Sequence, residues 1–185
     1  MTHLLDRSSA LLLVIDVQER INAVMNDQGH IPRIQVLIEA SRALDLPVIA
    51  SEQYPKGLGA TVEPLAGLLG DVPDDKDTFS CARDTGLREA IAASGRPEVV
   101  VTGIEAHVCV MQTVLDLIDA GYRVHVPHDA VNSRRPADKH WALERMQAAG
   151  AVITSTESAL FELLERCDTA DFKTVAKLVK KLPVP

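Results

Sequence analysis

The stretch EVVVTGIEAHVCVMQTVLDLIDAG, residues 98–121, decides the fold of this chain. Its first seven residues, Glu98–Ile104, form an almost continuously apolar run rich in β-branched side chains, which is typical of a strand buried on both faces of a parallel sheet. From His107 to Ala120 the apolar residues recur at helical spacing, and Gly121 is a typical residue to end a helix. A buried strand that passes directly into an amphipathic helix indicates a β-α-β unit.

The same alternation continues along the rest of the chain. Short, β-branched apolar runs predict further strands over 10–17, 47–51, 122–127 and 151–155. Helical periodicity predicts helices over 31–44, 85–94, 136–149, 155–164 and 169–182. Strands that alternate with helices favour right-handed crossovers onto one sheet. We therefore predict an α/β fold: a three-layer α-β-α sandwich with a mostly parallel, Rossmann-like sheet and helices on both faces.

Length and composition indicate one globular domain. A chain of 185 residues with 46% hydrophobic and 24% charged residues suits a single domain over 1–185. We expect its helices over about 155–182 to pack on that domain or on a partner subunit. The net charge of −7 disfavours a nucleic-acid partner, because phosphate binding needs a concentrated basic surface.

The N-terminal apolar run and the cysteines indicate the compartment. The run is closely bracketed by charged residues, is too short to span a membrane and lacks the basic leader of a signal peptide. The three cysteines are far apart and lack C-x-x-C spacing, so we expect neither a disulfide framework nor structural zinc. We therefore expect a cytoplasmic protein with no membrane contact.

Ligands of open α/β sheets bind beyond the carboxyl ends of the strands, so the chemistry is expected there. Cys109 follows a buried strand at a helix start, where the helix dipole favours a thiolate; alternatively it is a small buried hydrophobe. Asp16 ends an apolar strand, where a carboxylate is costly unless paired or used; alternatively it caps the turn over 18–22. Lys76 lies in the longest irregular region, 52–79, where by itself it is most simply a surface lysine.

Three segments together resemble the isochorismatase-like cysteine hydrolase superfamily. They are LLLVIDVQ with Asp16, KDTFSC with Lys76, and VVVTGIEAHVCV with Cys109. Their order and spacing match the Asp–Lys–Cys triad of that superfamily, and the resemblance runs from about Leu11 to Leu164. The segments SEQYPKGLG and ITSTESALFELL are similar to the subgroup of isochorismatase domain-containing proteins.

The resemblance implies a reaction and a role for each residue of the triad. Cys109 is expected to be the nucleophile, Asp16 the group that takes and returns its proton, and Lys76 a positive charge that favours the thiolate and keeps Asp16 ionised. Relatives have a non-proline cis peptide before the nucleophile, which maps to Ile104–Glu105. The backbone N–H groups of Glu105 and Cys109 would then form the oxyanion hole. The implied reaction is hydrolysis of a small amide or related carbonyl compound through a thioester.

The chain departs from some relatives in ways that bear on metal and substrate. Nicotinamidases carry an Asp-x-His metal motif after the second strand, whereas this chain reads Ser-Glu-Gln-Tyr over 51–54. We therefore expect no metal and no cofactor. His125, His128 and Asp129 suggest a metal site, but they are more simply a helix-facing histidine and the start of a turn. Siderophore-pathway isochorismatases need no cysteine nucleophile, so Cys109 argues against that reaction.

Less specific residues complete the hypothesis. Candidates for the wall of the substrate pocket, each with loop packing as its alternative, are Gln18, Gln53, Tyr54, Phe79 and Val108. The expected partner is a small-molecule substrate, and relatives are usually homo-oligomers. Competing hypotheses are a binding or scaffold module that works through oligomeric contacts, with Trp141 and the terminal helices in a subunit interface, and a redox-sensitive thiol protein.

Overall fold

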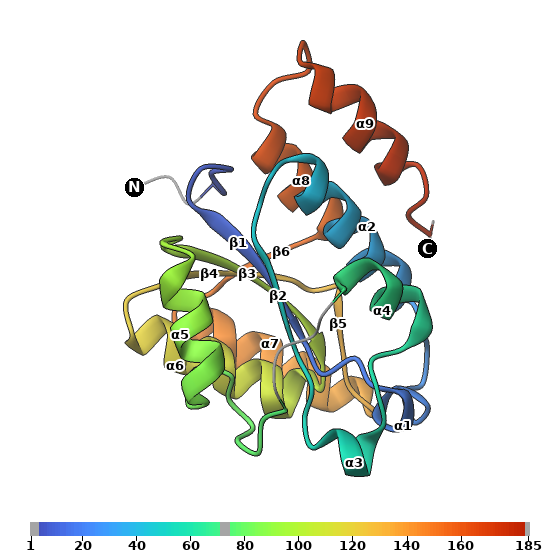
Figure 1. The fold of residues 1–185 in the computed structure, drawn as a ribbon, viewed down its shortest axis with the longest axis vertical. Helices are drawn as coiled ribbons and strands as arrows, with labels where there is room; N and C mark the ends of the chain where they lie inside the picture. Colours follow the sequence, from blue (N-terminus) through green and yellow to red (C-terminus); the bar gives the residue numbers. More distant parts are fainter. Residues whose placement is uncertain (1–3, 71–74, 184–185) are drawn as a thin grey trace.

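A computed structural model describes residues 4–70 and 75–183 of the chain. Within these residues the protein has one six-stranded parallel sheet with helices on both faces (Figure 1). The sheet order is β2-β1-β3-β4-β6, and β5 pairs with the carboxyl end of β3. The strands are β1 (Ala10–Ile15), β2 (Val48–Ser51), β3 (Glu98–Ile104), β4 (Arg123–Pro127), β5 (Val131–Asn132) and β6 (Val152–Thr154). The predicted α/β fold with a mostly parallel sheet is confirmed.

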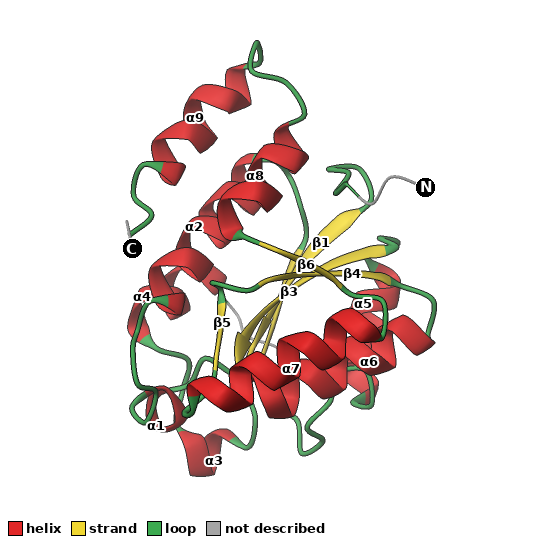
Figure 2. Cartoon of the chain, turned by 180° about the vertical axis from the view of Figure 1, so that it is seen from behind, coloured by secondary structure: helices red, strands yellow, loops and turns green. Residues whose placement is uncertain are grey.

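The helices connect the strands and form the two outer layers (Figure 2). On one face lie α2 (His30–Ala43), α8 (Thr156–Leu164) and α9 (Ala170–Val179). On the other face lie α5 (Thr85–Ala93), α6 (Met111–Asp119) and α7 (Pro136–Ala148). Short helices lie in the connections: α1 (Glu19–Asn22), α3 (Pro55–Leu58) and α4 (Glu63–Leu69). The terminal helices α8 and α9 pack against α2.

Alternate residues of the strands divide the core into two halves. Leu12 and Val14 of β1 pack with the apolar residues of α2, α8 and α9. Leu11 and Leu13 of the same strand pack with α5, α6 and α7. Because successive side chains of a strand point to opposite faces, a strand covered on both sides must be apolar throughout. This explains the uninterrupted run that identified β1 and β3 in the sequence.

The central strands β1 and β3 lie very close to each other at their carboxyl ends. Ile15 lies opposite Gly103, and Gly103 has φ +116°. A Cβ atom there would lie 2.0 Å from the carbonyl oxygen of Ile15, so only glycine fits. This contact sets the sheet edge from which Asp16 and the segment after Ile104 emerge.

Local structure differs from the sequence prediction at three points. The strand predicted over 10–17 ends at Ile15, because Asp16 adopts the left-handed backbone conformation (φ 52°). The helix predicted from His107 begins with a π-helical turn, η1 (Ala106–Val110), before α6. The region 52–79 is not irregular throughout, since α3 and α4 lie in it; its residues 71–74 are outside the described part. Among the described residues, no helix is both long enough and apolar enough to cross a membrane.

Candidate active site

Asp16 lies at the carboxyl end of β1 with its carboxylate almost completely buried. Each carboxylate oxygen has its own donor. Lys76 Nζ lies 2.7 Å from Oδ2, and Ser51 Oγ donates to Oδ1 over 2.8 Å. The left-handed turn at Asp16 ends strand pairing and leads the chain into α1. Asp16 is therefore a paired internal carboxylate, and Gln18, not Asp16, occupies the N-cap position of α1.

Lys76 is completely buried, which corrects the simpler interpretation of an exposed surface lysine. Besides Asp16, its ammonium contacts Gln53 Oε1 at 2.7 Å and the carbonyl oxygens of Thr78 and Phe79 at 3.2 Å each. Burial alone would lower the pKa of Lys76. The negative charge of Asp16 and its hydrogen bond to the ammonium oppose this effect, and the net shift of the pKa is upward, so Lys76 is a cation at neutral pH.

The backbone of Lys76 joins the two loops that flank this ion pair. Its N–H donates to Glu52 O over 3.0 Å, and its carbonyl accepts from the Tyr54 N–H over 3.2 Å. These bonds form an isolated parallel β-bridge between Lys76 and Gln53, next to the carboxyl end of β2. Lys76 is thereby fixed by both its main chain and its ammonium group.

Cys109 is the fourth residue of η1 and is only 4% exposed. Its thiol lies beside the ion pair. It forms a hydrogen bond with Asp16, and the charges of both Asp16 and Lys76 affect its pKa. Burial raises the pKa of the Cys109 thiol well above its usual value, Asp16 raises it further, and Lys76 offsets only part of this increase. The expectation that this position favours a resting thiolate is therefore wrong: the thiol is the resting form, with a carboxylate beside it to receive the proton.

The turn between β3 and η1 has the geometry that the resemblance implied. The Ile104–Glu105 peptide bond is cis. The Glu105 carboxylate is buried, and its Oε1 accepts hydrogen bonds from Arg134 Nε (2.9 Å) and from the Arg134 backbone N–H (3.2 Å). This ion pair ties the turn to the segment between β5 and α7.

The two glutamines predicted in the pocket wall have other contacts. Gln18 is completely buried; its Nε2 donates to Gln53 O and Gly59 O, and its Oε1 accepts from the Gln53 N–H. All of these partners are backbone atoms of loops. We therefore conclude that Gln18 holds the loops together and does not line the pocket. The Gln53 side chain holds Lys76 and also donates to Asp77 O over 3.2 Å.

The other three pocket candidates lie nearer the surface around the triad. Tyr54 and Phe79 are each 53% exposed, and both are anchored through main-chain contacts to Lys76. Val108 directly precedes Cys109 and is partly buried. An exposed aromatic residue on each side of the Lys76 segment is suited to contact a ligand approaching the thiol.

Sequence reasoning missed the contacts of Ser51 and Cys81 with the site. Ser51 lies opposite Ile15 in the β1–β2 register, and its carbonyl accepts from the Asp16 N–H over 3.1 Å. Cys81 Sγ donates to Ser51 Oγ over 3.5 Å. The signal was available in the predicted strands: residues that end neighbouring parallel strands lie side by side.

His128 and Asp129 lie in the turn that follows β4, as the simpler interpretation expected. His125 is a buried residue of β4, and Asp129 accepts from Thr156 and pairs with Arg33. His107 Nδ1 lies 3.0 Å from Ser133 Oγ. Over residues 4–70 and 75–183, no three His, Cys, Asp or Glu side chains gather closely enough to hold a metal ion.

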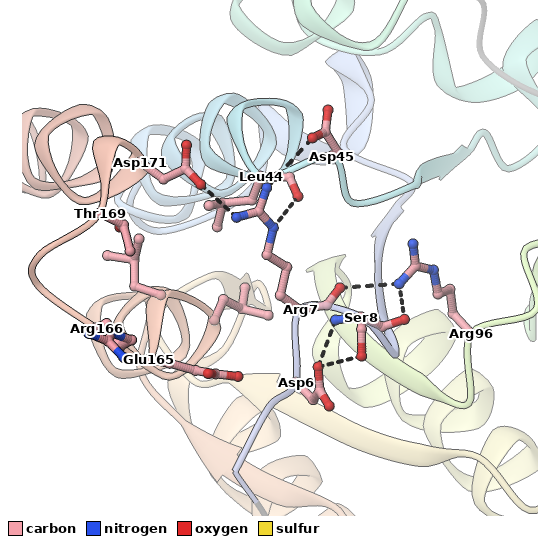
Figure 3. A pocket seen from close by; sticks show the side chains of 12 residues that line it. Asp6, Arg7, Ser8, Leu44, Asp45, Arg96, Glu165, Arg166, Thr169 and Asp171 are labelled. Atoms are coloured by element: carbon pink, nitrogen blue, oxygen red, sulfur yellow. Dashed lines mark hydrogen bonds and ion pairs between the residues drawn. The ribbon is translucent and has the colours of Figure 1, made fainter.

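An open hollow of about 710 Å³ lies at the opposite end of the sheet, at the amino ends of the strands (Figure 3). Its charged groups largely satisfy one another. Arg7 pairs with Asp171 at 2.6 Å and with Asp45 at 3.6 Å, and Arg96 donates to backbone carbonyls of Arg7 and Ser8. The cluster around Cys109 is the stronger candidate, because a nucleophile, a base and a cation converge there.

Comparisons with known proteins point to one family. A family model described as an isochorismatase domain matches residues 10–158. The chain is 38% identical to a secreted isochorismatase effector of Phytophthora sojae, over 94% of this chain and 85% of that protein. It is 37% identical to isochorismatase domain-containing protein 1 of Danio rerio, over 95% of this chain but 62% of that protein.

Two solved structures share the fold. The MAR1 ribonuclease from Caenorhabditis elegans superposes with a TM-score of 0.88 at 36% identity, covering 98% of this chain and 97% of that one. An octameric hydrolase of unknown specificity from Escherichia coli gives a TM-score of 0.92 at 23% identity, covering 98% and 92%.

Proposed function

This chain belongs to the isochorismatase family of hydrolases, and from that membership we propose that it hydrolyses a small amide or a related carbonyl compound through a thioester on Cys109. The observation that carries the proposal is the buried Asp16–Lys76 ion pair beside the Cys109 thiol. Burying two charges is costly, so a buried ion pair beside a thiol in the interior is a candidate functional site.

The first half of the reaction would form the thioester. Cys109 Sγ attacks the substrate carbonyl carbon while its proton moves to Asp16. The backbone N–H groups of Glu105 and Cys109 are the proposed donors to the carbonyl oxygen as it gains negative charge. The C–N bond then breaks, and the leaving amine takes the proton from Asp16.

The second half would release the acid. Water attacks the thioester carbonyl and gives a proton to Asp16, the C–S bond breaks, and the proton returns to the Cys109 sulfur. The acid leaves, and the enzyme regains a thiol and a carboxylate, which are its resting forms.

Lys76 would act in both halves without donating a proton. An ammonium has three protons, and Lys76 already faces four oxygen acceptors at 2.7–3.2 Å. Its part is to hold Asp16 in place and keep it ionised, and to hold the loop that carries Phe79.

The burial of the site supports a small substrate. Cys109 is nearly inaccessible, whereas Tyr54 and Phe79, which contact Lys76 through their main chains, extend well into solvent. We propose that these two aromatic residues and Val108 contact the substrate. A large polymer would have to displace them to reach the thiol.

The proposal also covers the oligomeric state and the cellular location of the protein. We propose a homo-oligomer, because large apolar residues such as Trp141 are exposed and the similar E. coli hydrolase is octameric. We also propose a cytoplasmic location, because the three cysteines lack the spacing of a disulfide framework, although the P. sojae relative is a secreted protein.

The nematode relative is a ribonuclease, so RNA is the second substrate to be tested. The net charge of −7 and the burial of Cys109 favour a small neutral compound over RNA. A non-catalytic scaffold or a redox-sensing thiol would not need the buried ion pair.

The deciding experiment is a screen of small amides, with RNA included, against wild type, Cys109→Ala, Asp16→Asn and Lys76→Met. We expect hydrolysis of an amide by wild type, loss of at least ~100-fold in each variant, and an acyl adduct on Cys109 detected by intact-protein mass spectrometry. RNA cleavage that persists in Cys109→Ala, or amide hydrolysis unaffected by that change, would contradict the proposal.

A further inference from the structure

Asp16 has a second fixed donor that the reaction above does not use. Ser51 Oγ donates to Oδ1 over 2.8 Å, on the carboxylate oxygen that Lys76 does not hold. The sheet register places it there, because Ser51 ends β2 opposite Ile15 and accepts the Asp16 N–H through its own carbonyl. Ser51 is completely enclosed, so no solvent molecule can readily replace its hydroxyl.

Cys81 fixes the direction of the Ser51 hydroxyl. Cys81 Sγ lies 3.5 Å from Ser51 Oγ and donates to it. A carboxylate only accepts, and a hydroxyl has a single proton, so the Ser51 proton points to Asp16 while its oxygen receives the Cys81 thiol. Burial raises the pKa of Cys81 to about 11, so the thiol keeps its proton near neutral pH.

Cys81 is in turn tied to the turn that carries the nucleophile. Its backbone N–H donates to Thr113 Oγ1 over 2.9 Å, and Thr113 Oγ1 donates to the Cys109 carbonyl over 2.7 Å. The chain of contacts therefore runs from η1 through Cys81 and Ser51 to Asp16. The titratable groups that face Asp16 are Lys76, Cys109 and Cys81.

We propose that Ser51 is a positioning residue that keeps the Asp16 carboxylate ionised and oriented toward Cys109, and that Cys81 orients Ser51. This inference rests on the proposed role of Asp16 as the base. A hydrogen bond to a carboxylate favours its ionised form, so loss of the Ser51 hydroxyl should let Asp16 take up a proton from solvent at a higher pH.

Alkylation of Cys109 by iodoacetamide tests this inference on the full chain without knowledge of the substrate. The sulfur attacks the methylene carbon, iodide leaves, and the thiol proton passes to Asp16. Peptide mass spectrometry follows the rate from pH 4 to 9, with the exposed Cys167 as an internal reference thiol. We expect Ser51→Ala to move the acid-side midpoint of the Cys109 profile upward by about one pH unit.

Matched variants separate this role from a structural one. Ser51→Thr and Cys81→Ser retain the donors and should keep the wild-type midpoint, whereas Cys81→Ala should shift it in the direction of Ser51→Ala by a smaller amount. Ser41→Ala removes another buried hydroxyl, on α2, and should shift nothing. A variant that only loosens the fold would change the plateau rate without moving the midpoint.

The outcomes distinguish this inference from the proposed function. If Asp16→Asn changes the profile but Ser51→Ala matches Ser41→Ala, the role of Ser51 is wrong and the function stands. If Asp16→Asn leaves the Cys109 profile unchanged, both the base and its positioning residue are overturned.

Discussion

At the scale of single residues, the buried charges of Asp16 and Lys76 support each other. Asp16 has one cation at 2.7 Å, and Lys76 has no exposed surface through which water could solvate it. Removing one partner of a buried pair leaves an uncompensated charge, which is far more costly than losing a pair at the surface.

We therefore expect Lys76→Met to lower the free energy of unfolding by ~3–5 kcal/mol, measured by urea denaturation. The double variant Asp16→Asn with Lys76→Met should recover part of that loss, because neither charge remains. Lys181→Met removes an exposed lysine paired with Glu39 and serves as the control, with a loss below ~1 kcal/mol. Equal losses from Lys76→Met and Lys181→Met would contradict this account.

The sequence identified the residues of the candidate site but not their contacts. Asp16, Lys76 and Cys109 could be proposed because a carboxylate, an amine and a thiol stood in recognisable segments. The hydrogen bonds of Ser51 and Gln53 could not be predicted, since they depend on which atoms Asp16 and Lys76 present to them. The protonation of Cys109 was predicted wrongly, because burial and the charge of Asp16 outweigh the helix position and Lys76.

At the scale of secondary-structure elements, Gly103 sets the contact between the central strands. Its φ of +116° and the nearby Ile15 carbonyl exclude any side chain. We expect Gly103→Ala to destabilise the fold by at least ~3 kcal/mol, or to yield insoluble protein, as measured by expression and thermal unfolding.

The control for this prediction is Gly67→Ala in α4. A Cβ there meets no atom within 4 Å, and alanine favours helix, so stability should be unchanged or rise by ~0.5–1 kcal/mol. Gly103→Ala protein as stable as Gly67→Ala protein would show that the strands can separate without cost.

His30 joins three elements and makes their packing sensitive to pH. At the start of α2, its Nε2 lies 2.9 Å from Asn22 Oδ1 of α1, and its Nδ1 lies 3.3 Å from Asn132 Nδ2 of β5. Burial lowers the pKa of His30 to about 4. The charge of Asp27 opposes this shift, and the charge of Lys139 adds to it. The folded protein therefore holds His30 neutral where the unfolded chain would protonate it.

Because the folded pKa of His30 is below the unfolded value of 6.5, its contribution to stability is present above pH 6.5 and is lost as pH falls toward 4. This term amounts to ~3 kcal/mol over the whole window. Urea denaturation from pH 7 to 4 should show a shallower loss of stability for His30→Gln than for wild type. His140→Gln, at an exposed position, should follow the wild-type slope.

Most of the strands and helices could be predicted, and the exceptions have physical causes. β3 was placed at its observed bounds because its seven residues are all buried. β5 consists of two residues, too few to show a pattern, and exists because it pairs with Gly103 and Ile104. The π-helical turn at 106–110 could not be distinguished from an α-helix, because both produce similar apolar spacing.

At the scale of the whole molecule, the exposed apolar residues predict how copies of the chain associate. Trp141 is 68% exposed on α7, with the ring of His140 edge-on to its own. Light scattering should give a mass that is a multiple of 20.0 kDa for wild type. We expect Trp141→Glu to lower this mass, because a charge in an apolar interface is costly.

Phe161→Glu on α8 tests a different face and is the comparison for Trp141→Glu. A reduced mass for Phe161→Glu alone would place the interface on α8 instead of α7. A wild-type mass of a single chain would contradict the predicted oligomer.

The crowded surroundings of the Lys76 ammonium have a consequence for chemical labelling. A lysine reacts with acylating reagents through the lone pair of its neutral amine, and Lys76 is held protonated among four oxygen atoms inside the fold. In the native protein, acetic anhydride should modify the exposed lysines and leave Lys76 untouched until the chain unfolds. In each variant, protection of Lys76 from acetylation, compared with the exposed lysines, would then report whether the interior around the site is still closed.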